Sequence, residues 1–476
     1  MKKLALIIDD DADFRRFVAD CLSEAGWEVA QASDGETGLE LARARRPDAV
    51  VCDLLMPRGN GFQVCRTLRA DPALRDLTIV VTSGRTFPAD RDAALEAGAD
   101  AYLTKPFSPG HLLEVLARPA LARGEGSAIA AELERTGSSP APGAAVAVGT
   151  PPSRQASASG AWFRFWGVRG SVPAPGPGTA RYGGNTSCVE VRAGGQIIIL
   201  DAGTGLRPLG RALMEEFGPR PLHLTLLLTH THWDHIQGLP FFRPLYEPQC
   251  RLRILGYEGA RQSLVNVLTS QMESPYFPVP FEELPANVQI EELRDMAFEL
   301  RADGAHGATS AISVRAHFAN HPGVCVGYRL DTTDGALVFF PDNEPWTRVH
   351  VTRSATHGPS GTTADVEAFA RAEEAKMIEF MRGAEALILD AQYDATEYPA
   401  HVGWGHGSVE SAVALALRAG IGTLFLFHHD PEHDDATIDR MVAAARERVA
   451  REGGKLAVEA AQEGVRVELA TLRRGR

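Results

Sequence analysis

The chain has 476 residues, a length that suggests two or three domains. Hydrophobic residues make up 44% of the sequence and charged residues 23%, values typical of soluble globular proteins. The formal net charge of −13 opposes binding to long nucleic acids unless a local basic patch overrides it.

No apolar run is long enough to span a bilayer. The apolar start of the chain ends at three consecutive aspartates, Asp9 to Asp11, which is too early for a signal peptide. The six cysteines are scattered without metal-ligand spacing and indicate reduced thiols. We therefore expect a cytoplasmic protein.

Short apolar strands alternate with amphipathic helices over residues 1–119. We expect strands at 4–8, 28–30, 49–52, 78–81 and 101–103, and helices at 14–24, 35–45, 61–68, 89–96 and 110–117. Five βα units of this kind predict a doubly wound parallel sheet that binds ligands at the carboxyl ends of its strands.

Polar residues occupy those strand ends. Asp9 and Asp10 follow the first strand, Asp53 ends the third, Thr82 ends the fourth, and Lys105 follows the fifth. Clustered carboxylates repel one another unless a cation joins them, and Mg²⁺ prefers oxygen ligands. Asp53 could then attack a phosphoryl group while Lys105 neutralises charge and Thr82 donates a hydrogen bond. Any one of the five could be a solvated turn residue, but that explanation is poor for all of them together.

This segment resembles the receiver domain of bacterial response regulators. The matching stretches are Ile8–Asp11, Asp53–Pro57, Val81–Ser83 and Lys105–Phe107. The resemblance implies that a cognate sensor histidine kinase phosphorylates Asp53. It also implies a Mg²⁺ site at Asp9, Asp10, Asp53 and the Leu55 carbonyl. Tyr102 matches the aromatic residue that moves on activation.

Residues 120–160 are rich in alanine, proline, serine and glycine. Such a composition cannot bury enough apolar surface to offset the entropy of ordering the chain. We expect a flexible linker here, between a first domain at 1–119 and a second at 161–476.

The second domain contains Thr-His-Thr-His-Trp-Asp-His directly after the apolar run 222–228. His230 and His232 leave one face of the strand end, and Asp234 and His235 follow where a helix start would return the chain to the same place. Three imidazoles and a carboxylate form a ligand set for zinc or another first-row metal. The alternative is a polar turn whose histidines cap backbone groups, but four potential ligands rarely coincide at this spacing.

His321, Asp342 and His428 lie near the ends of other apolar strands. Each alone would more often be structural, but together they supply what a two-metal site lacks. We expect one metal on His230, His232 and His321, the other on Asp234, His235 and His428, and Asp342 as a bridge. Metals about 3.5–4 Å apart stabilise both the attacking and the leaving oxygens of a displacement.

Two residues bear on these ligands. Asp201 ends the strand 197–200 and fits a buried carboxylate that orients a ligand histidine. His429 is an alternative to His428, because strand alternation lets only one of the two point inward.

His406 precedes an amphipathic helix at 409–419 and could protonate a leaving group, with Asp390 orienting it. Alternatively, His406 is a helix-capping turn residue. Asp234 is expected to be catalytic as well as metal-binding. The aromatic and proline-rich segment 237–300 could be ordinary core or a wall or lid beside the metals.

Residues 161–476 resemble the metallo-β-lactamase fold, in the branch that holds tRNase Z and the cyclic-nucleotide and phosphonate-pathway phosphodiesterases. The resemblance is carried by the His-x-His-x-Asp-His motif, by Asp342 after His321, by Asp390 and His406, and by the stretch 426–431. It implies an αββα sandwich and phosphodiester hydrolysis by two metals, for which we favour zinc over manganese or iron.

The chain departs from tRNase Z in having no evident basic arm and in an extra segment at 344–382. A small nucleotide is therefore favoured over tRNA. We interpret the chain as an α/β response regulator in which a receiver controls a hydrolase. The expected partners are the kinase and a small phosphodiester. We expect no DNA-binding output and no membrane contact, and a homodimer is possible. An ester or lactone hydrolase and a non-catalytic, metal-bound output module are the alternatives.

Overall fold

The computed structural model describes residues 2–117, 160–301, 311–346 and 363–474. The predicted linker at 120–160 thus lies, apart from residue 160, outside the described residues. No helix in the described ranges is long and apolar enough to cross a membrane.

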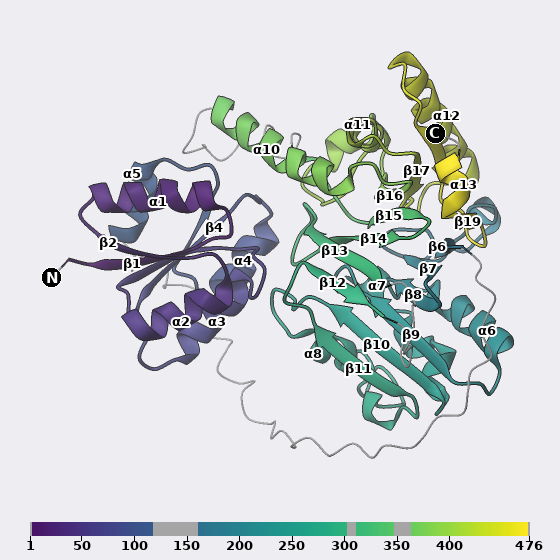
Figure 1. Ribbon diagram of the computed structural model, residues 1–476, viewed down its shortest axis with the longest axis horizontal. Coiled ribbons are helices and arrows are strands. Elements are labelled where there is room, and N and C mark those ends of the chain that lie inside the picture. Colours follow the sequence, from purple (N-terminus) through teal and green to yellow (C-terminus); the bar gives the residue numbers. More distant parts are fainter. Residues whose placement is uncertain (1, 118–159, 302–310, 347–362, 475–476) are drawn as a thin grey trace.

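The first region is a parallel five-stranded sheet in the order β2-β1-β3-β4-β5, which confirms the doubly wound fold (Figure 1). Its strands are β1 (Leu4–Ile8), β2 (Glu28–Ala32), β3 (Ala49–Asp53), β4 (Thr78–Ser83) and β5 (Ala101–Thr104). Its helices are α1 (Ala12–Glu24), α2 (Gly35–Arg45), α3 (Gly61–Ala70), α4 (Pro88–Glu96) and α5 (Pro109–Ala117). Helices α1 and α5 cover one face, and α2, α3 and α4 the other.

The central strand β3 is buried along its whole length, as expected for a parallel sheet covered on both faces. Helices α1, α2 and α3 each begin at an aspartate or asparagine, Asp11, Asp34 and Asn60, whose side chain accepts backbone N–H groups of the first turn. These caps fix where the loops at the carboxyl edge of the sheet end.

The second region contains two seven-stranded sheets. The first has the order β11-β10-β9-β8-β7-β6-β19, and the second β12-β13-β14-β15-β16-β17-β18. The strands of the first sheet are β6 (Trp162–Gly167), β7 (Cys188–Ala193), β8 (Gln196–Leu200), β9 (Leu222–Leu227), β10 (Cys250–Gly256), β11 (Asn287–Glu292) and β19 (Arg466–Glu468). Those of the second are β12 (Ala297–Leu300), β13 (Ile312–Phe318), β14 (Val326–Thr332), β15 (Gly335–Phe340), β16 (Ala386–Asp390), β17 (Thr423–Phe427) and β18 (Ala457–Ala460).

The inner faces of these sheets share one apolar core that includes Phe163 and Phe165 of the first sheet and Phe339 and Phe427 of the second. Helices cover the two outer faces, so the predicted αββα sandwich is confirmed. The helices are α6 (Leu206–Phe217), α7 (Trp233–Ile236), α8 (Leu264–Ser270), α10 (Thr363–Met381), α11 (Val409–Ala419), α12 (Asp435–Arg451) and α13 (Leu469–Arg474).

The segment 237–300 contributes ordinary core, whereas a wall or lid beside the metals stays a prediction. Phe242 is fully buried in the core beneath α6, whereas its neighbour Phe241 is 59% exposed. In the extra segment 344–382, residues 347–362 lie outside the described part. Helix α10 follows, and Met377 and Met381 pack it onto the core of the second sheet.

Candidate metal centre and phosphorylation site

The central histidine motif begins just beyond β9. His230 is buried there, and helix α7 starts at Trp233 and turns the buried Asp234 and His235 back toward it. His232 is exposed, so the centre opens on its side. A strand end followed at once by a helix start therefore places four polar side chains together, as the spacing predicts.

One group of potential ligand atoms belongs to His230, His232, His321 and Asp342, all within 4.8 Å of one another. The Nε2 atom of His321 lies 3.0 Å from Nδ1 of His232 and 3.5 Å from Oδ2 of Asp342. Nε2 of His230 lies 3.6 Å from the same Oδ2.

A second group belongs to Asp234, His235 and His428. Nε2 of His428 lies 3.1 Å from Oδ2 of Asp234 and 3.3 Å from Oδ1 of Asp342. Nε2 of His235 lies 3.1 Å from that same Oδ1. Asp342 thus turns Oδ2 to the first group and Oδ1 to the second, the arrangement that a bridging carboxylate requires.

These residues fit a metal site on their own chemistry. Among the described side chains, Nε2 of His230, Nε2 of His235 and Oδ1 of Asp342 are buried and make no hydrogen bond of normal geometry, although the last two atoms lie 3.1 Å apart. Leaving such an atom unsatisfied costs about 1–3 kcal/mol, so three that converge indicate a ligand that satisfies them. Nitrogen and carboxylate donors suit zinc, manganese or iron. The fold implies divalent metals, but which ions bind is a prediction.

The protonation states agree with metal binding. Burial holds the pKa of His230 and of His321 well below the usual range, which leaves neutral imidazoles. Burial works against ionisation of Asp342, yet the surrounding imidazoles hold the pKa of its carboxyl well below the usual range. His235 differs: burial lowers its pKa, but Asp234, Asp342 and Asp201 outweigh burial and raise that pKa well above the usual range, and His235 in turn is the first of the imidazoles that lower the pKa of Asp342. The neutral His230 and His321 and the ionised Asp342 are in the forms that bind a cation, and His235 would release its proton to bind one.

In three of these histidines the ring nitrogen that does not face the centre, Nδ1, lies at hydrogen-bond distance from another protein group. Nδ1 of His235 lies 2.7 Å from Oδ2 of Asp201, as predicted for that carboxylate. Nδ1 of His321 lies 2.9 Å from the Gly405 carbonyl oxygen. Each bond fixes the ring so that Nε2 faces the centre.

His428 is held in the same way, with Nδ1 3.0 Å from Oε1 of Gln392. Its backbone has φ of 60°, a left-handed conformation that is strained for a non-glycine residue. A Cβ atom on Gly170 would lie 2.3 Å from Nδ1 of His428, so only glycine fits beside this ring. His429 turns away and lies 3.0 Å from the Ala461 carbonyl oxygen, which leaves His428 as the inward residue.

His406 lies beside both groups of ligand atoms. Its Nδ1 is 2.9 Å from Oδ2 of Asp390 and 3.9 Å from Oδ2 of Asp342, and its ring stacks on His428. Burial lowers the pKa of His406, but Asp390 and Asp342 outweigh burial and raise that pKa to about 9. The ring therefore carries a proton at neutral pH. The N-cap residue of α11 is Ser408. His406 therefore does not cap this helix.

Two supporting residues were missed by the sequence analysis. Gln392 orients His428, and it follows Asp390 in a segment without regular periodicity. Glu344 is buried and accepts the backbone N–H groups of Gly403 and Gly405, so it holds the loop that carries His406. The only sequence signal for the role of Glu344 was its position, a carboxylate two residues after Asp342.

The first region brings together the acidic residues at its strand ends. Nζ of Lys105 lies 2.7 Å from Oδ2 of Asp9 and 2.5 Å from Oδ1 of Asp53. Asp53 is the register partner of Thr82, and its Oδ2 accepts the Leu55 N–H. Burial and the neighbouring Asp53 raise the pKa of Asp9 to about 6, although Lys105 opposes them. A further cation would relieve this repulsion.

The remaining residues of this region lie close by. Asp10 is exposed next to Asp9 at the end of β1. The Tyr102 hydroxyl is turned inward and donates to the Arg85 carbonyl oxygen at 3.0 Å. The arrangement agrees with the predicted phosphorylation site, whereas Mg²⁺ binding and the role of the Leu55 carbonyl stay predictions.

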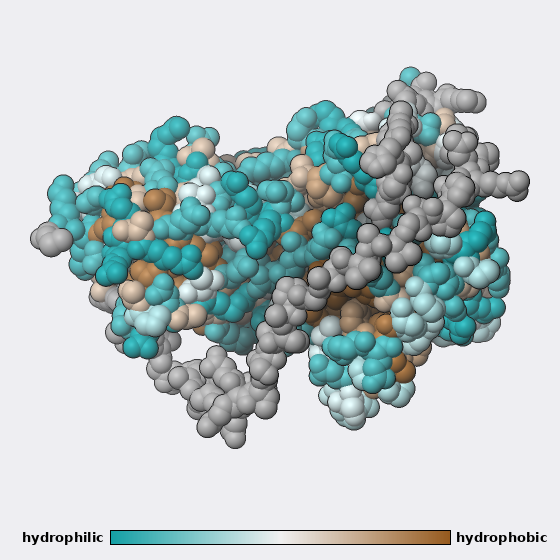
Figure 2. All heavy atoms as spheres, turned by 60° about the horizontal axis from the view of Figure 1, so that its bottom comes forward, coloured by the Kyte–Doolittle hydropathy of each residue, from teal (hydrophilic) through white to brown (hydrophobic). Residues whose placement is uncertain are grey.

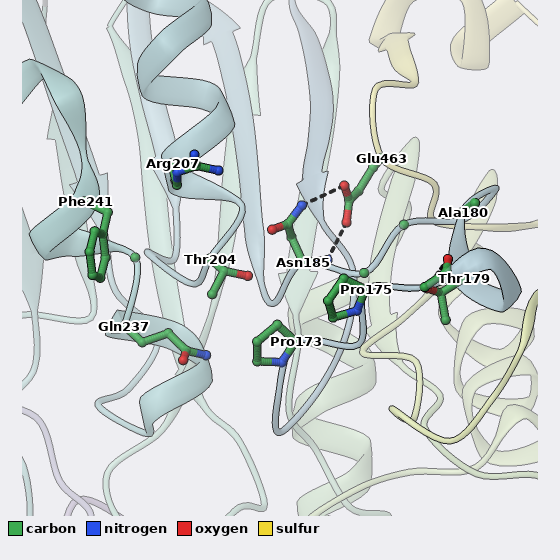
Figure 3. A pocket seen from close by; sticks show the side chains of 14 residues that line it. Pro173, Pro175, Thr179, Ala180, Asn185, Thr204, Arg207, Gln237, Phe241 and Glu463 are labelled. Atoms are coloured by element: carbon green, nitrogen blue, oxygen red, sulfur yellow. Dashed lines mark hydrogen bonds between the residues drawn. The ribbon is translucent and has the colours of Figure 1, made fainter.

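The second domain has a cavity of about 480 Å³ (Figure 3). Gln237, two residues after His235, lines it together with Phe241, Arg207 and Asn185. None of the predicted ligands is among its lining residues, so this cavity is separate from the metal centre.

The ligand assignment predicts three different metal contents. Asp342→Ala should lose both metals, because its two oxygens face different groups, whereas His428→Ala should retain one. His429→Ala is the matched control and should keep both. Elemental analysis of the purified variants measures the number of metal ions per chain. Two metals per chain in both Asp342→Ala and His428→Ala would refute the assignment.

Comparison with known proteins assigns each region to a family. Residues 5–117 match the family model of the response regulator receiver domain, and residues 196–429 match that of the beta-lactamase superfamily domain. The response regulator MprA of Mycolicibacterium vanbaalenii is 46% identical over 113 residues, which are 24% of this chain and 47% of that protein. The probable transcriptional regulator ycf27 of Guillardia theta is 39% identical over 136 residues, 29% of this chain and 52% of that protein. The chain spans about half the length of these curated relatives.

Two solved structures resemble the second region. The metallo-beta-lactamase fold protein YhfI from Bacillus subtilis is 16% identical with a TM-score of 0.42, covering 64% of this chain and 98% of that chain. A diphosphatase from the PhnP family is 18% identical with a TM-score of 0.42, covering 65% of this chain and 97% of that chain. On its sequence families and its fold, the chain is a response regulator receiver domain joined to a domain of the metallo-β-lactamase fold.

Proposed function

We propose that the second domain is a metal-dependent phosphodiesterase for a small nucleotide and that phosphorylation of Asp53 controls it. One observation carries the proposal. The two oxygens of Asp342 face two separate groups of ligand atoms, and the protonated His406 lies 3.9 Å from one of them. Two cations and a proton donor around one carboxylate match the needs of phosphodiester cleavage.

Divalent metals in such a site supply Lewis-acid charge stabilisation and lower the pKa of water. The remaining work falls to the protein. Asp390 accepts backbone N–H groups of Asn343 and Gln392, so its carboxylate is fixed before it holds His406. His406 then offers a proton to the oxygen of a departing alcohol. The Ser171 N–H donates a hydrogen bond to Oδ2 of Asp234 at 2.8 Å and so fixes this carboxylate. We propose that Asp234 both binds metal and supports catalysis.

Two exposed tryptophans that are close in sequence to residues of the centre support a nucleotide substrate. Trp233 is 76% exposed and follows the ligand His232. Trp404 is 61% exposed and precedes Gly405, whose carbonyl oxygen holds His321. Large rings left in water beside a catalytic centre favour a partner with an aromatic face, and nucleobases stack on such rings.

The substrate class can be tested with a panel of cyclic and linear nucleotide phosphodiesters, glycerophosphodiesters and lactones. We expect turnover of the nucleotides. In Trp404→Ala the KM for them should rise about tenfold, since stacking one base contributes about 1–3 kcal/mol. The KM for a glycerophosphodiester, which has no base, should stay constant. Turnover of lactones alone would replace the proposal with an ester hydrolase, and no turnover at all would favour a non-catalytic module.

His406 should act as a proton donor and not as a metal ligand. His406→Ala should keep its metal content while turnover of a poor leaving group falls by about 10²–10⁴-fold. The loss should shrink for p-nitrophenol esters, whose leaving group needs no proton. Equal losses for both substrates, or loss of metal, would contradict this role.

Asp390→Asn gives an independent measurement on the same proton. The carboxylate raises the pKa of His406, so an amide should lower it. Because activity needs the protonated ring, the basic limb of the pH–rate profile should then shift to lower pH. An unchanged basic limb would place the essential proton elsewhere.

A further inference from the structure

The receiver packs directly on the hydrolase domain through α3, α4 and the loops beside them (Figure 1). Arg66 on α3 donates to the Ala260 carbonyl oxygen at 2.6 Å and to Oε1 of Glu258 at 2.5 Å. Val324 of the hydrolase domain is buried in the apolar core of the receiver. Figure 2 shows teal polar and brown apolar residues side by side on the outer face of the molecule. The two domains therefore share core packing as well as ion pairs.

One receiver side chain reaches toward the metal centre. Arg85 follows β4 and is only 1% exposed. Its two terminal nitrogens donate to the carbonyl oxygens of Ala319 and Gly323, the residues two before and two after the ligand His321. Asp90 on α4 accepts the Gly323 N–H at 2.7 Å. The short loop that carries His321 is thus bonded from both ends to the receiver.

The backbone of Arg85 is in turn bonded to groups near the phosphorylation site. Its N–H donates to Oγ of Ser83 at 3.1 Å, and its carbonyl oxygen accepts the Tyr102 hydroxyl at 3.0 Å. Ser83 follows Thr82, the register partner of Asp53. Two residues, Ser83 and Gly84, therefore separate Thr82, the register partner of Asp53, from the arginine whose guanidinium holds the His321 loop.

The guanidinium is not fully satisfied in this arrangement. Nε of Arg85 is buried without a hydrogen-bond partner among the described residues, and Nη1 is 3.5 Å from Oδ2 of Asp90. A buried cation whose bonds are incomplete has room to gain interactions elsewhere. Gly84 leaves no space for a side chain, since a Cβ there would lie 2.5 Å from the Phe369 ring on α10.

We propose that Arg85 is a positioning residue through which phosphorylation of Asp53 sets the geometry of His321, and this rests on the hydrolase function proposed above. A phosphoryl group adds strong acceptor oxygens and about 1.5–2 negative charges at Asp53. It draws the Thr82 hydroxyl toward itself and shifts the end of β4. Arg85 moves with that segment, and the two carbonyl bonds carry the movement to the loop of His321. Small displacements of a positioned group change catalytic rates strongly.

The test uses the full chain with Mg²⁺, with and without beryllofluoride as the phosphoryl mimic. Hydrogen–deuterium exchange of the peptide around 316–326 reports on the loop, and turnover of bis(p-nitrophenyl) phosphate reports on the hydrolase. In the wild type we expect beryllofluoride to change loop exchange and to change turnover by about 5–150-fold, the usual range of coupling between two sites. Asp53→Ala should respond in neither measurement.

Arg85→Gln should lose both responses while its receiver still binds beryllofluoride, measured by fluorine NMR. Arg85→Lys keeps the charge but cannot reach both carbonyls with a planar fork, so it should respond only partly. Arg261→Gln removes an exposed ion pair with Glu96 at the same interface and should respond like the wild type. Retention of the full response in folded Arg85→Gln and Arg85→Lys would overturn the proposal.

The two readouts separate this inference from the proposed function. A chain with no turnover in any variant refutes the hydrolase, yet loop exchange still reports whether Arg85 transmits the state of Asp53. Turnover in the wild type with an unresponsive loop leaves the hydrolase intact and refutes the route through Arg85.

Discussion

The carboxylate of Asp342 is the constraint on which the rest of the hydrolase centre depends. It lies two residues beyond β15, and each of its two oxygens faces one histidine that follows the first sheet and one that follows a strand of the second. The first sheet contributes the motif after β9 and the support of Asp201 after β8, while the second contributes His321, Asp390 and His428. Strand ends of both sheets must therefore meet at one edge before any cation can bind. The strained backbone of His428 and the close approach of Gly170 are consequences of that convergence.

The same edge is where the receiver lies. Its α4 and the loop after β4 contact the segment that carries His321, so the two chemical sites are joined by packed groups and not only by the chain between the domains. A buried arginine bonded to two backbone carbonyl oxygens has few arrangements available to it. The control that we propose for Arg85 would act through this direct contact between the two domains.

Much of this structure could be predicted from the sequence because its signals are local. Strand β1, helix α2 and helix α11 have the expected bounds, and all seven predicted metal ligands meet in the two expected groups. Gln392 and Glu344 could not be predicted, since each acts on a residue brought near only by folding. Arg85 is the clearest case: in sequence it is one polar loop residue, and its partner Ala319 is 234 residues away. Contacts between domains leave no periodicity that a sequence analysis could detect.

The central claim is a pair of cations on either side of Asp342, one on each group of ligands. Anomalous diffraction from crystals of the full chain, collected on both sides of the zinc, manganese and iron absorption edges, measures this directly. The account predicts two peaks, one among His230, His232 and His321 and the other among Asp234, His235 and His428, with Asp342 between them. A single peak, or two peaks that do not share Asp342, would contradict it.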